Sequence, residues 1–202
     1  MSSTRVVAFD VDGTLTTRDC VVPFLRRVAG LPTMFWRLAR AGRATIPAVV
    51  RRDRDTLKAH ATRAAFTGRA ITSVEAMATD FAAEVVDGWL RDDTLVELRR
   101  HQAEHDTTVL VSASYAIYLR PLAAALGVDD VLATELETGP DGRFTGRLVG
   151  ANCRGPEKVR RLHEWLDQHH QGRTAVHLTA YGDSAGDREM LADADEAQWI
   201  TK

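Results

Sequence analysis

The sequence of 202 residues contains little cysteine and no long apolar run. Its two cysteines, Cys20 and Cys153, stand far apart, and we interpret them as reduced thiols of a cytoplasmic protein rather than as a disulfide. No apolar run approaches the roughly 20 residues that a membrane-spanning helix needs. The first residues also lack the apolar segment of a signal peptide. These absences favour a globular protein of the cytoplasm.

Neither sign of charge dominates the sequence. Lysine and arginine number 26 and aspartate and glutamate 28, so the net charge of −2 gives no signature of nucleic-acid binding, and we expect no nucleic-acid partner. Apolar residues make up 45% and charged residues 27%, which is ordinary for a globular protein. A chain of this length can bury a sizeable core as one domain, or as one domain with a smaller insert.

The most informative stretch lies near the N-terminus. Residues 6–9 form a short apolar run that predicts a buried strand. Asp10 and Asp12 follow at alternate positions, so on an extended strand end both carboxylates point the same way. Gly13 then permits a sharp turn. Such a pair is unfavourable in a buried position unless a cation neutralises it, and Mg²⁺ suits these hard oxygen ligands. The alternative is a surface turn, because Asp-Gly pairs are common in turns.

Residues 17–87 show helical patterns and no strand pattern. Four helices are expected there, and the first is broken at Gly30; they cover about residues 21–29, 34–40, 47–66 and 72–87. Thr72 and Glu75 have the spacing of a capping box, which predicts the start of the last helix.

This helical block separates the first strand from the next by roughly 70 residues. A simple crossover between parallel strands needs far fewer residues. We therefore interpret residues 17–87 as an inserted helical cap domain, and residues 1–16 and 88–202 as an α/β core domain.

Strands and helices alternate in the remainder of the sequence. The expected strands are residues 108–111, 131–133, 175–181 and 197–200. The expected helices are residues 93–105, 115–126, 157–170 and 184–192. A hairpin is predicted between residues 135–137 and 143–148. The alternation predicts a parallel sheet with helices on both faces, in which ligands bind at the C-terminal ends of the strands.

Polar side chains stand at or near these strand ends, namely Asp10, Asp12, Ser112, Lys158, Asp183 and Asp187. Carboxylates, a hydroxyl and an ammonium at one edge of a sheet suit phosphoryl transfer. One carboxylate can attack phosphorus and form an aspartyl-phosphate, while a second moves the proton of the leaving oxygen. Mg²⁺ and a lysine would offset the repulsion between the phosphate and the attacking carboxylate.

The same residues form four motifs whose order resembles the haloacid dehalogenase (HAD) superfamily of phosphatases. The motifs are Asp10-Val11-Asp12-Gly13-Thr14, Ser112, Lys158 and Gly182-Asp183-Ser184-Ala185-Gly186-Asp187. The resemblance spans about residues 5–193 and implies a doubly wound, Rossmann-like parallel core. The helical insert directly after the first motif resembles the small all-helical C1-type cap of that superfamily. Residues 111–114, the hairpin and residues 152–158 resemble the phosphoserine-phosphatase-like hydrolases of subfamily IB.

The resemblance implies a role for each acid. Asp10 is implied as the nucleophile, and Asp12 as the general acid and base whose main-chain carbonyl also binds Mg²⁺. Asp183 would complete the metal site with Asp10, and Asp187 would support the metal or orient the lysine. An acid at position 12 favours a phosphatase over cleavage of a carbon–halogen bond, because the dehalogenases of this superfamily lack it.

The resemblance also implies a phosphate-binding set. Ser112 and Lys158 would hold the phosphoryl group, with the N–H of Ala113 as a further donor. Each residue has an ordinary alternative role. The hydroxyl of Ser112 could bind the backbone at a strand end, and Lys158 could be a solvent-exposed lysine of a helix. Asp183 and Asp187 have the alternative of capping the following helix, and Ser114 that of a helix cap.

The cap is expected to select the leaving group, and its charge is uneven. Residues 18–69 carry 12 of the lysines and arginines but only three aspartates. A solvated helix face explains this excess most simply, and a basic lid over an anionic substrate is the functional alternative. A weaker hypothesis is contact with an anionic membrane surface through residues 34–43.

Asp19 and Arg63 stand near the positions of the acid and the arginine with which phosphoserine phosphatases hold their substrate. Asp19 replaces the usual glutamate, and Arg63 is not clearly in register. Ala113 and Ser114 stand where those enzymes carry two glycines. We therefore expect a small phosphomonoester as the substrate, with phosphoserine as one candidate.

Three other functions use the same fold. A phosphotransferase would pass the phosphoryl group to an alcohol, and a regulatory member would not turn over at all. A phosphonate hydrolase needs a cap lysine for a Schiff base, and Lys58 is the only lysine of residues 17–87. The oligomeric state is not predicted. Because the sequence ends soon after the last strand pattern, a missing edge element is a further expectation.

Overall fold

The computed structural model describes residues 4–30 and 54–201, and its centre is a six-stranded sheet. The strand order is β4-β3-β2-β1-β5-β6. All neighbouring pairs are parallel except β3 and β4, which are antiparallel. The strands are β1 Thr4–Phe9, β2 Thr107–Tyr115, β3 Asp130–Thr138, β4 Phe144–Val149, β5 Val176–Gly182 and β6 Glu196–Trp199. The predicted α/β fold with a parallel sheet is confirmed.

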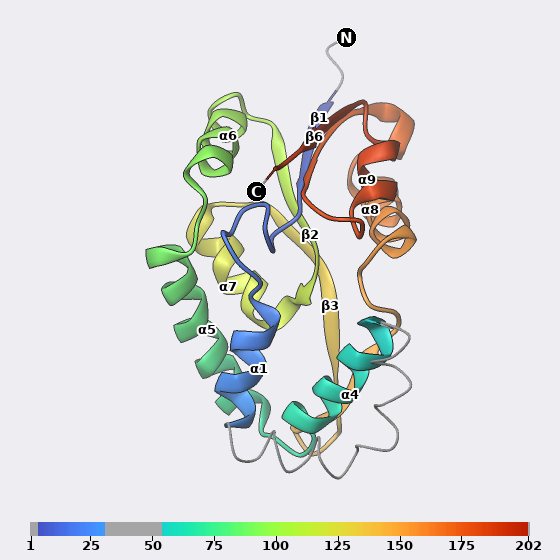
Figure 1. The fold of residues 1–202 in the computed structure, drawn as a ribbon. Coiled ribbons are helices and arrows are strands. Elements are labelled where there is room, and N and C mark those ends of the chain that lie inside the picture. Colours follow the sequence, from blue (N-terminus) through green and yellow to red (C-terminus); the bar gives the residue numbers. More distant parts are fainter. Residues whose placement is uncertain (1–3, 31–53, 202) are drawn as a thin grey trace.

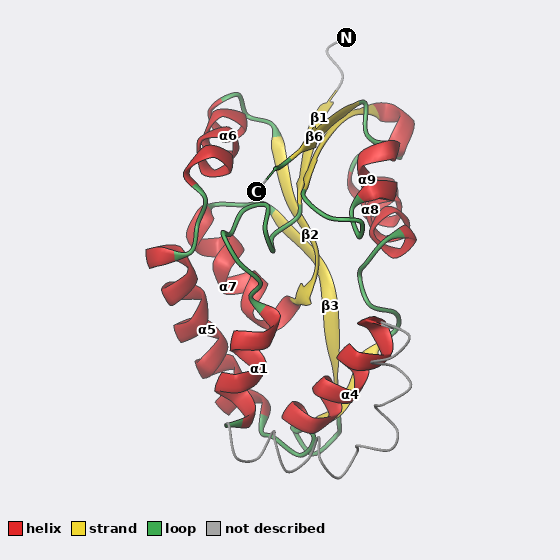
Figure 2. Ribbon diagram, in the orientation of Figure 1, coloured by secondary structure: helices red, strands yellow, loops and turns green. Residues whose placement is uncertain are grey.

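Helices cover both faces of the sheet, as Figures 1 and 2 show. Helices α6 (Asp92–Ala103) and α7 (Ala116–Leu126) lie on one side, and α8 (Pro156–His169) and α9 (Arg188–Asp193) on the other. A short 3₁₀ turn, Arg173–Ala175, precedes β5. Alternate residues of β1 serve the two faces: Val7 and Phe9 face the α6–α7 side, and Val6 and Ala8 the α8–α9 side.

Three helices of the predicted cap gather at the end of the molecule away from the N-terminus (Figure 1). They are α1 Val21–Ala29, α4 Arg54–Phe66 and α5 Ile71–Gly88. Their aromatic side chains pack against α7: the ring centroids of Phe24 and Tyr118 are 4.7 Å apart, and those of Phe81 and Tyr118 are 5.2 Å apart. The apolar cluster of these three helices is therefore continuous with that of the α6–α7 face of the sheet.

Some expectations fall outside the described residues. The predicted helix of residues 34–40, the first part of the predicted helix of 47–66 and the hypothetical membrane-contacting segment belong to this group. The described helix α4 begins at Arg54 and ends at Phe66, the same end as predicted. No helix of the described chain is long and apolar enough to cross a membrane. Cys20 and Cys153 are both free and buried, as expected for reduced thiols.

Two local predictions were wrong. Residues 131–133 and 135–137 belong to one strand, β3, because no turn-forming residue separates them and Thr134 pairs with Tyr115. The predicted capping box is also absent: α5 begins at Ile71, and its N-terminal residue Ala70 makes no side-chain cap. The N–H of Ile71 instead donates to the carbonyl of Gly142 in the hairpin turn, at 3.0 Å.

Candidate active site

The ends of three parallel strands bring the first set of predicted residues together. Phe9, the last residue of β1, pairs with Leu110 of β2 and with Tyr181 of β5. The N–H of Asp10 donates to the carbonyl of Tyr181 at 2.9 Å, which fixes where the chain leaves the sheet. A cavity of about 440 Å³ lies at this edge. Its lining includes every catalytic, phosphate-binding and metal-binding residue predicted for the core, namely Asp10, Asp12, Ser112, Ala113, Lys158, Asp183 and Asp187.

Lys158 lies between two carboxylates at the floor of this cavity. Its side chain is 1% exposed, and Nζ donates to Oδ1 of Asp10 at 2.6 Å and to Oδ1 of Asp187 at 2.5 Å. Burial alone would lower the pKa of Lys158, but the two carboxylates raise it, so the ammonium keeps its charge. Burial raises the pKa of Asp10 to about 7 although Lys158 opposes this shift. The alternative of a solvated helix lysine does not describe Lys158.

Asp12, at the same strand end, accepts hydrogen bonds from two donors. Its Oδ1 accepts the N–H of Cys20 at 2.7 Å, and its Oδ2 accepts the hydroxyl of Ser114. Burial and the nearby charge of Asp19 raise the pKa of Asp12, and the hydrogen bond from Ser114 acts in the opposite direction. Ser114 therefore does not cap a helix but binds an acid of the site.

Ser112 is fully buried in the second half of β2, two residues before Ser114. Its Oγ accepts the N–H of Ser114 at 3.1 Å. The hydroxyl oxygen thus accepts from the backbone, as the alternative role of Ser112 predicted. The hydroxyl hydrogen can still be donated to a ligand.

Asp183 and Gly13 are in close contact across the strand ends. Gly13 has φ +90°, and a Cβ built on it would lie 2.3 Å from Oδ2 of Asp183. Only glycine therefore fits at position 13 of the first motif, because any side chain there would overlap Asp183. Carboxylate oxygens of Asp10, Asp183 and Asp187 lie within 4.8 Å of one another. Hard oxygen donors at this spacing fit Mg²⁺.

Asp187 does not act as the predicted alternative of a helix cap. It precedes α9, but its side chain makes no cap hydrogen bond with that helix. Oδ2 accepts the hydroxyl of Ser184 at 2.7 Å and its N–H at 3.0 Å. Burial opposes ionisation of Asp187, but Lys158 and Ser184 lower its pKa and keep it charged.

Of the two residues predicted to bind the substrate from the insert, one lines the cavity and the other does not. Asp19 lines the cavity, and its Oδ1 accepts the N–H of Val22 at 3.1 Å in the first turn of α1. Arg63 is exposed on α4 and is not among the lining residues. Lys58, more than one turn earlier on the same helix, lines the cavity instead.

Lys58 connects helix α4 to strands β2 and β3 and to the turn before α8. Its Nζ donates to the carbonyl of Ala113, to Oγ1 of Thr134 at 3.1 Å and to Oδ1 of Asn152 at 2.7 Å. Burial lowers the pKa of Lys58 to about 8, although nearby acids partly oppose the shift. Nδ2 of Asn152 donates to Asp55 of the same cap helix at 2.7 Å.

Several residues that line or support the site were not predicted to do so, among them Ser114, Lys58 and Arg154. Ser114 carried a usable signal, because a serine two positions after Ser112 on a strand points to the same side. Lys58 and Arg154 carried none, since their placement depends on how α4 and the turn before α8 pack against the strand ends.

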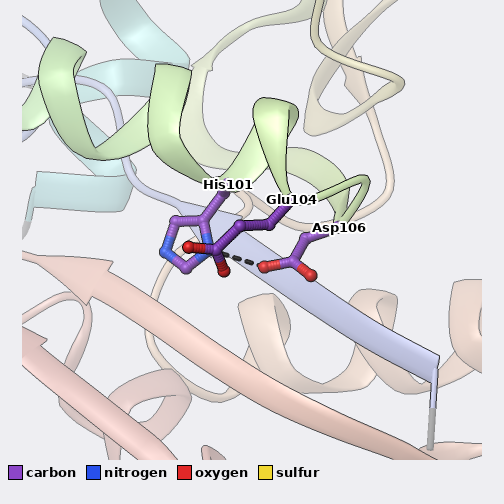
Figure 3. Close-up of side chains that lie close together, drawn as sticks. All are labelled: His101, Glu104 and Asp106. Atoms are coloured by element: carbon purple, nitrogen blue, oxygen red, sulfur yellow. Dashed lines mark hydrogen bonds and ion pairs between the residues drawn. The ribbon is translucent and has the colours of Figure 1, made fainter. Parts of the chain in front are cut away.

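A second cluster of possible metal ligands contains His101 at the end of α6, Glu104 directly after it and Asp106 just before β2 (Figure 3). Nδ1 of His101 and Oδ2 of Asp106 are 2.7 Å apart and point toward one another. Arg5 pairs with Asp106 at 3.2 Å, and Arg100 with Glu104 at 3.1 Å. Because these charges already have partners, we interpret this cluster as a structural link between α6 and the sheet.

The geometry of the strand ends agrees with comparisons to known proteins. The sequence profile of the haloacid dehalogenase-like hydrolase family matches residues 7–192. The chain belongs to this family. Protein CicA of Caulobacter vibrioides is 41% identical over 192 residues, which cover 95% of this chain and 83% of that protein.

Phosphatases are among the other similar proteins. Phosphoserine phosphatase SerB2 of Mycobacterium tuberculosis is 28% identical, over 94% of this chain and 42% of that protein. A solved structure from Bordetella pertussis Tohama I has a TM-score of 0.72 at 26% identity and covers 95% of this chain and 87% of its own. Phosphoserine phosphatase in its apo form has a TM-score of 0.61 at 16% identity, covering 95% and 83%, and shares the HAD fold.

Proposed function

We propose that this HAD hydrolase is a Mg²⁺-dependent phosphatase that acts on small phosphate monoesters through an aspartyl-phosphate at Asp10. The observation that carries the proposal is the hydrogen-bonded row of Asp10, Lys158 and Asp187 in a cavity, with Asp12 at the same strand end. This arrangement offers a nucleophile, a proton carrier and a positive charge within one site. The relatives named phosphoserine phosphatase and, in Neisseria meningitidis, histidinol-phosphatase support the same class of reaction.

In the first step, a carboxylate oxygen of Asp10 would attack phosphorus as the bond to the leaving oxygen breaks. An ammonium has three donors, and Lys158 gives two of them to Asp10 and Asp187 among the described residues. The third is available to an oxygen of the phosphate. The hydroxyl of Ser112 and the N–H of Ala113 would bind further phosphate oxygens.

Asp12 would carry the proton in both steps. Burial raises its pKa, which favours the protonated form that can donate to the leaving oxygen. In the second step Asp12 would accept a proton from water while that water attacks phosphorus, releasing inorganic phosphate and free Asp10. The donors from Cys20 and Ser114 fix the direction of the carboxyl group.

Asp10 and Asp183 would hold Mg²⁺, together with the main-chain carbonyl of Asp12 and with support from Asp187. The donor set of three close carboxylates supports this assignment. When bound, Mg²⁺ supplies positive charge that lowers the repulsion between the phosphate and the nucleophile.

The division into two domains is part of the proposal. Residues 17–87 would act as the cap, which excludes water and selects the leaving group, and residues 1–16 and 88–202 as the catalytic core. The cavity wall supports this, because Asp19, Val22 and Leu25 of the α1 region and Leu57 and Lys58 of α4 all line it. Phosphoserine remains one candidate substrate among small phosphomonoesters.

A panel of phosphate esters tests the proposal. We expect turnover of at least one small ester with Mg²⁺, its loss with a chelator, and no measurable turnover by Asp10→Asn. Asp80→Asn is the matched control, because Asp80 is an exposed acid of α5 and should keep full activity. The absence of turnover of any ester with Mg²⁺, or retained activity in Asp10→Asn, would contradict the proposal. Adding acceptor alcohols and analysing the products distinguishes hydrolysis from phosphotransfer.

One observation bears on the phosphonate-hydrolase alternative: Lys58 lines the cavity with a lowered pKa. A Schiff base needs a neutral amine with a free electron pair, whereas Lys58 donates to three oxygen acceptors. Asp12, which that chemistry does not require, is also present. We therefore expect no reduced adduct when borohydride is added with a β-carbonyl phosphonate, and an adduct at Lys58 would favour the alternative.

A further inference from the structure

Four basic side chains line the cavity, and they differ in what they contact. Lys158 is bound to two carboxylates, and Lys58 to three neutral oxygens. The guanidinium carbon of Arg18 lies 3.5 Å from the centroid of the Trp89 ring. Within residues 4–30 and 54–201, neither of the two arginines has a hydrogen bond or ion pair to its guanidinium, and Arg154 also has no aromatic ring against it.

The backbone around Arg154 is fixed against the fourth motif. The N–H of Arg154 donates to the carbonyl of Asn152 at 2.7 Å, which makes a tight turn. The N–H of Gly155 donates to the carbonyl of Gly186 at 2.9 Å, which joins this turn to the loop between Asp183 and Asp187. The base of the Arg154 side chain is therefore held at the cavity wall.

Gly186 leaves the space that the Arg154 side chain occupies. A Cβ built on Gly186 would lie 3.0 Å from Nε and 3.1 Å from Cγ of Arg154. Any larger residue at this position would push the guanidinium away. The arginine is thus packed in a defined place over the loop that carries the acids, and it does not extend freely into solvent.

We propose that Arg154 determines specificity by binding a second anionic group, a carboxylate or a phosphate, on the leaving group of the substrate. The inference rests on the proposed phosphatase function and deepens it by naming the substrate class. A partly buried guanidinium without an anion of its own is paired most favourably by a planar or tetrahedral oxyanion. Lys58 adds charge nearby, because its acceptor Asn152 stands two residues before Arg154.

Arg154 and the lysine that contacts the proposed nucleophile come from different segments of the cavity wall. Lys158 of α8 donates to Asp10, whereas Arg154 lies on the turn that precedes α8. The cap residues Val22, Leu25 and Leu57 complete the wall with apolar surface. A short leaving group with one charged end suits this combination of an apolar wall and the guanidinium of Arg154.

Matched esters test the inference. Three short-chain alkyl phosphates that end in a hydroxyl, a carboxylate or a second phosphate are compared as substrates by kcat/KM. We expect the wild-type protein to prefer one anionic ester over the hydroxyl ester, and Arg154→Met to reduce this preference ratio by about 10-fold or more. Arg154→Lys should restore part of the ratio. Arg147→Met, which removes an exposed arginine of β4, should leave the ratio unchanged.

Binding to an inactive variant keeps the two proposals distinguishable. Calorimetry with Asp10→Asn measures the affinity for the same three esters without turnover, and the double variant with Arg154→Met measures the loss. Tighter binding of an anionic ester that disappears with Arg154→Met supports the inference even if no ester is hydrolysed, which would contradict only the proposed function. Equal affinity for all three esters, or a preference that survives Arg154→Met in a folded protein, would overturn the inference.

Discussion

At the scale of single residues, the site depends on charges that are buried in pairs. Lys158 keeps its ammonium at 1% exposure because Asp10 and Asp187 both accept from it. Removing one member of such a group leaves an uncompensated buried charge, which costs about 3–5 kcal/mol. Asp12 has different partners, because it accepts from a main-chain N–H and a hydroxyl and not from a cation. This contrast separates the roles that we propose for the two acids of the first motif.

Ser114→Ala tests whether the hydroxyl orients Asp12. A hydrogen bond to a charged group contributes about 1.5–3 kcal/mol, so we expect kcat/KM, which reports the phosphorylation step alone, to fall about 10-fold or more on alkyl phosphates, whose leaving oxygen needs a proton. On p-nitrophenyl phosphate the loss should be small, because its leaving group departs without protonation. Ser73→Ala, at an exposed position of α5, is the control. Equal losses on both substrates would contradict the assignment.

The ammonium of Lys58 predicts a dependence of stability on pH. Its pKa falls from the ordinary 10.5 to about 8 in the folded chain, chiefly because burial disfavours the charged form. Between these two values the unfolded chain binds more protons than the folded chain, so the free energy of unfolding contributed by this group rises as the pH rises from about 8 to 10.5. Below pH 8 the contribution no longer changes.

Urea denaturation of the wild-type protein and of Lys58→Met checks this dependence. The difference between their unfolding free energies should shift in favour of the wild-type protein as the pH is raised through that window. Two of the acceptors of Lys58 also bond to one another, since the hydroxyl of Thr134 donates to Oδ1 of Asn152 at 2.8 Å. A difference that stays constant from pH 7 to 10.5 would show that the pKa of Lys58 is not lowered.

At the scale of elements, the proposed cap is attached to the core through helix α4 and the β3–β4 hairpin. Gly146 of β4 has φ +81°, and a Cβ there would lie 2.1 Å from Oγ1 of Thr67 and 3.1 Å from the main-chain Cα of Arg63. The helix end and the strand therefore approach as closely as glycine permits. Gly142, in the hairpin turn, has φ +72° but no atom within 4 Å of such a Cβ.

This pair of glycines gives a matched test of the attachment. Gly142→Ala should lower the unfolding free energy by about 1–2 kcal/mol, the cost of a left-handed backbone for alanine. Gly146→Ala carries the same backbone cost and a steric overlap, which adds about 1–3 kcal/mol. Denaturant titration measures both. Equal losses in the two variants would mean that α4 moves away from β4 without cost.

The order of strands and helices could be predicted from sequence, because apolar periodicity and glycine positions are local signals. The hairpin and the ends of the core helices belong to this class. The start of α5 could not, since the carbonyl that accepts the Ile71 N–H belongs to Gly142, about 70 residues away in sequence. Residues 130–138 were not predicted as one strand, because the sequence pattern of one long strand is the same as that of a short strand followed, after one residue, by a hairpin arm.

Some residues of the candidate site could also be predicted from local sequence signals, and others could not. Asp10, Ser112, Lys158 and Asp183 could be predicted, because they follow strands or a helix start in a motif order. Lys58 replaces the expected Arg63 at the cavity because helix α4 turns that face toward β2 and β3, and helix rotation is set by packing rather than by local pattern.

At the scale of the whole molecule, one sheet edge collects residues that are spread over most of the chain. Parallel strands β1, β2 and β5 end at this edge, and the first helix of the insert follows directly after the first motif. The helices of the proposed cap share an apolar cluster with α7, whereas α8, which carries Lys158, packs in a second cluster on the other face of the sheet. This arrangement places a substrate between the proposed nucleophile and the groups that would recognise its leaving end.

The most direct test of this account is chemical trapping of the intermediate. The protein is mixed with Mg²⁺ and a rapidly hydrolysed phosphate ester, quenched during turnover and treated with borohydride, which reduces an aspartyl-phosphate to homoserine. Peptide mass spectrometry should find homoserine in place of Asp10 and nowhere else, and none in a sample without ester. Turnover of the ester with unmodified Asp10, or with the label at Asp12 or Asp183, would contradict the central claim that Asp10 is the nucleophile.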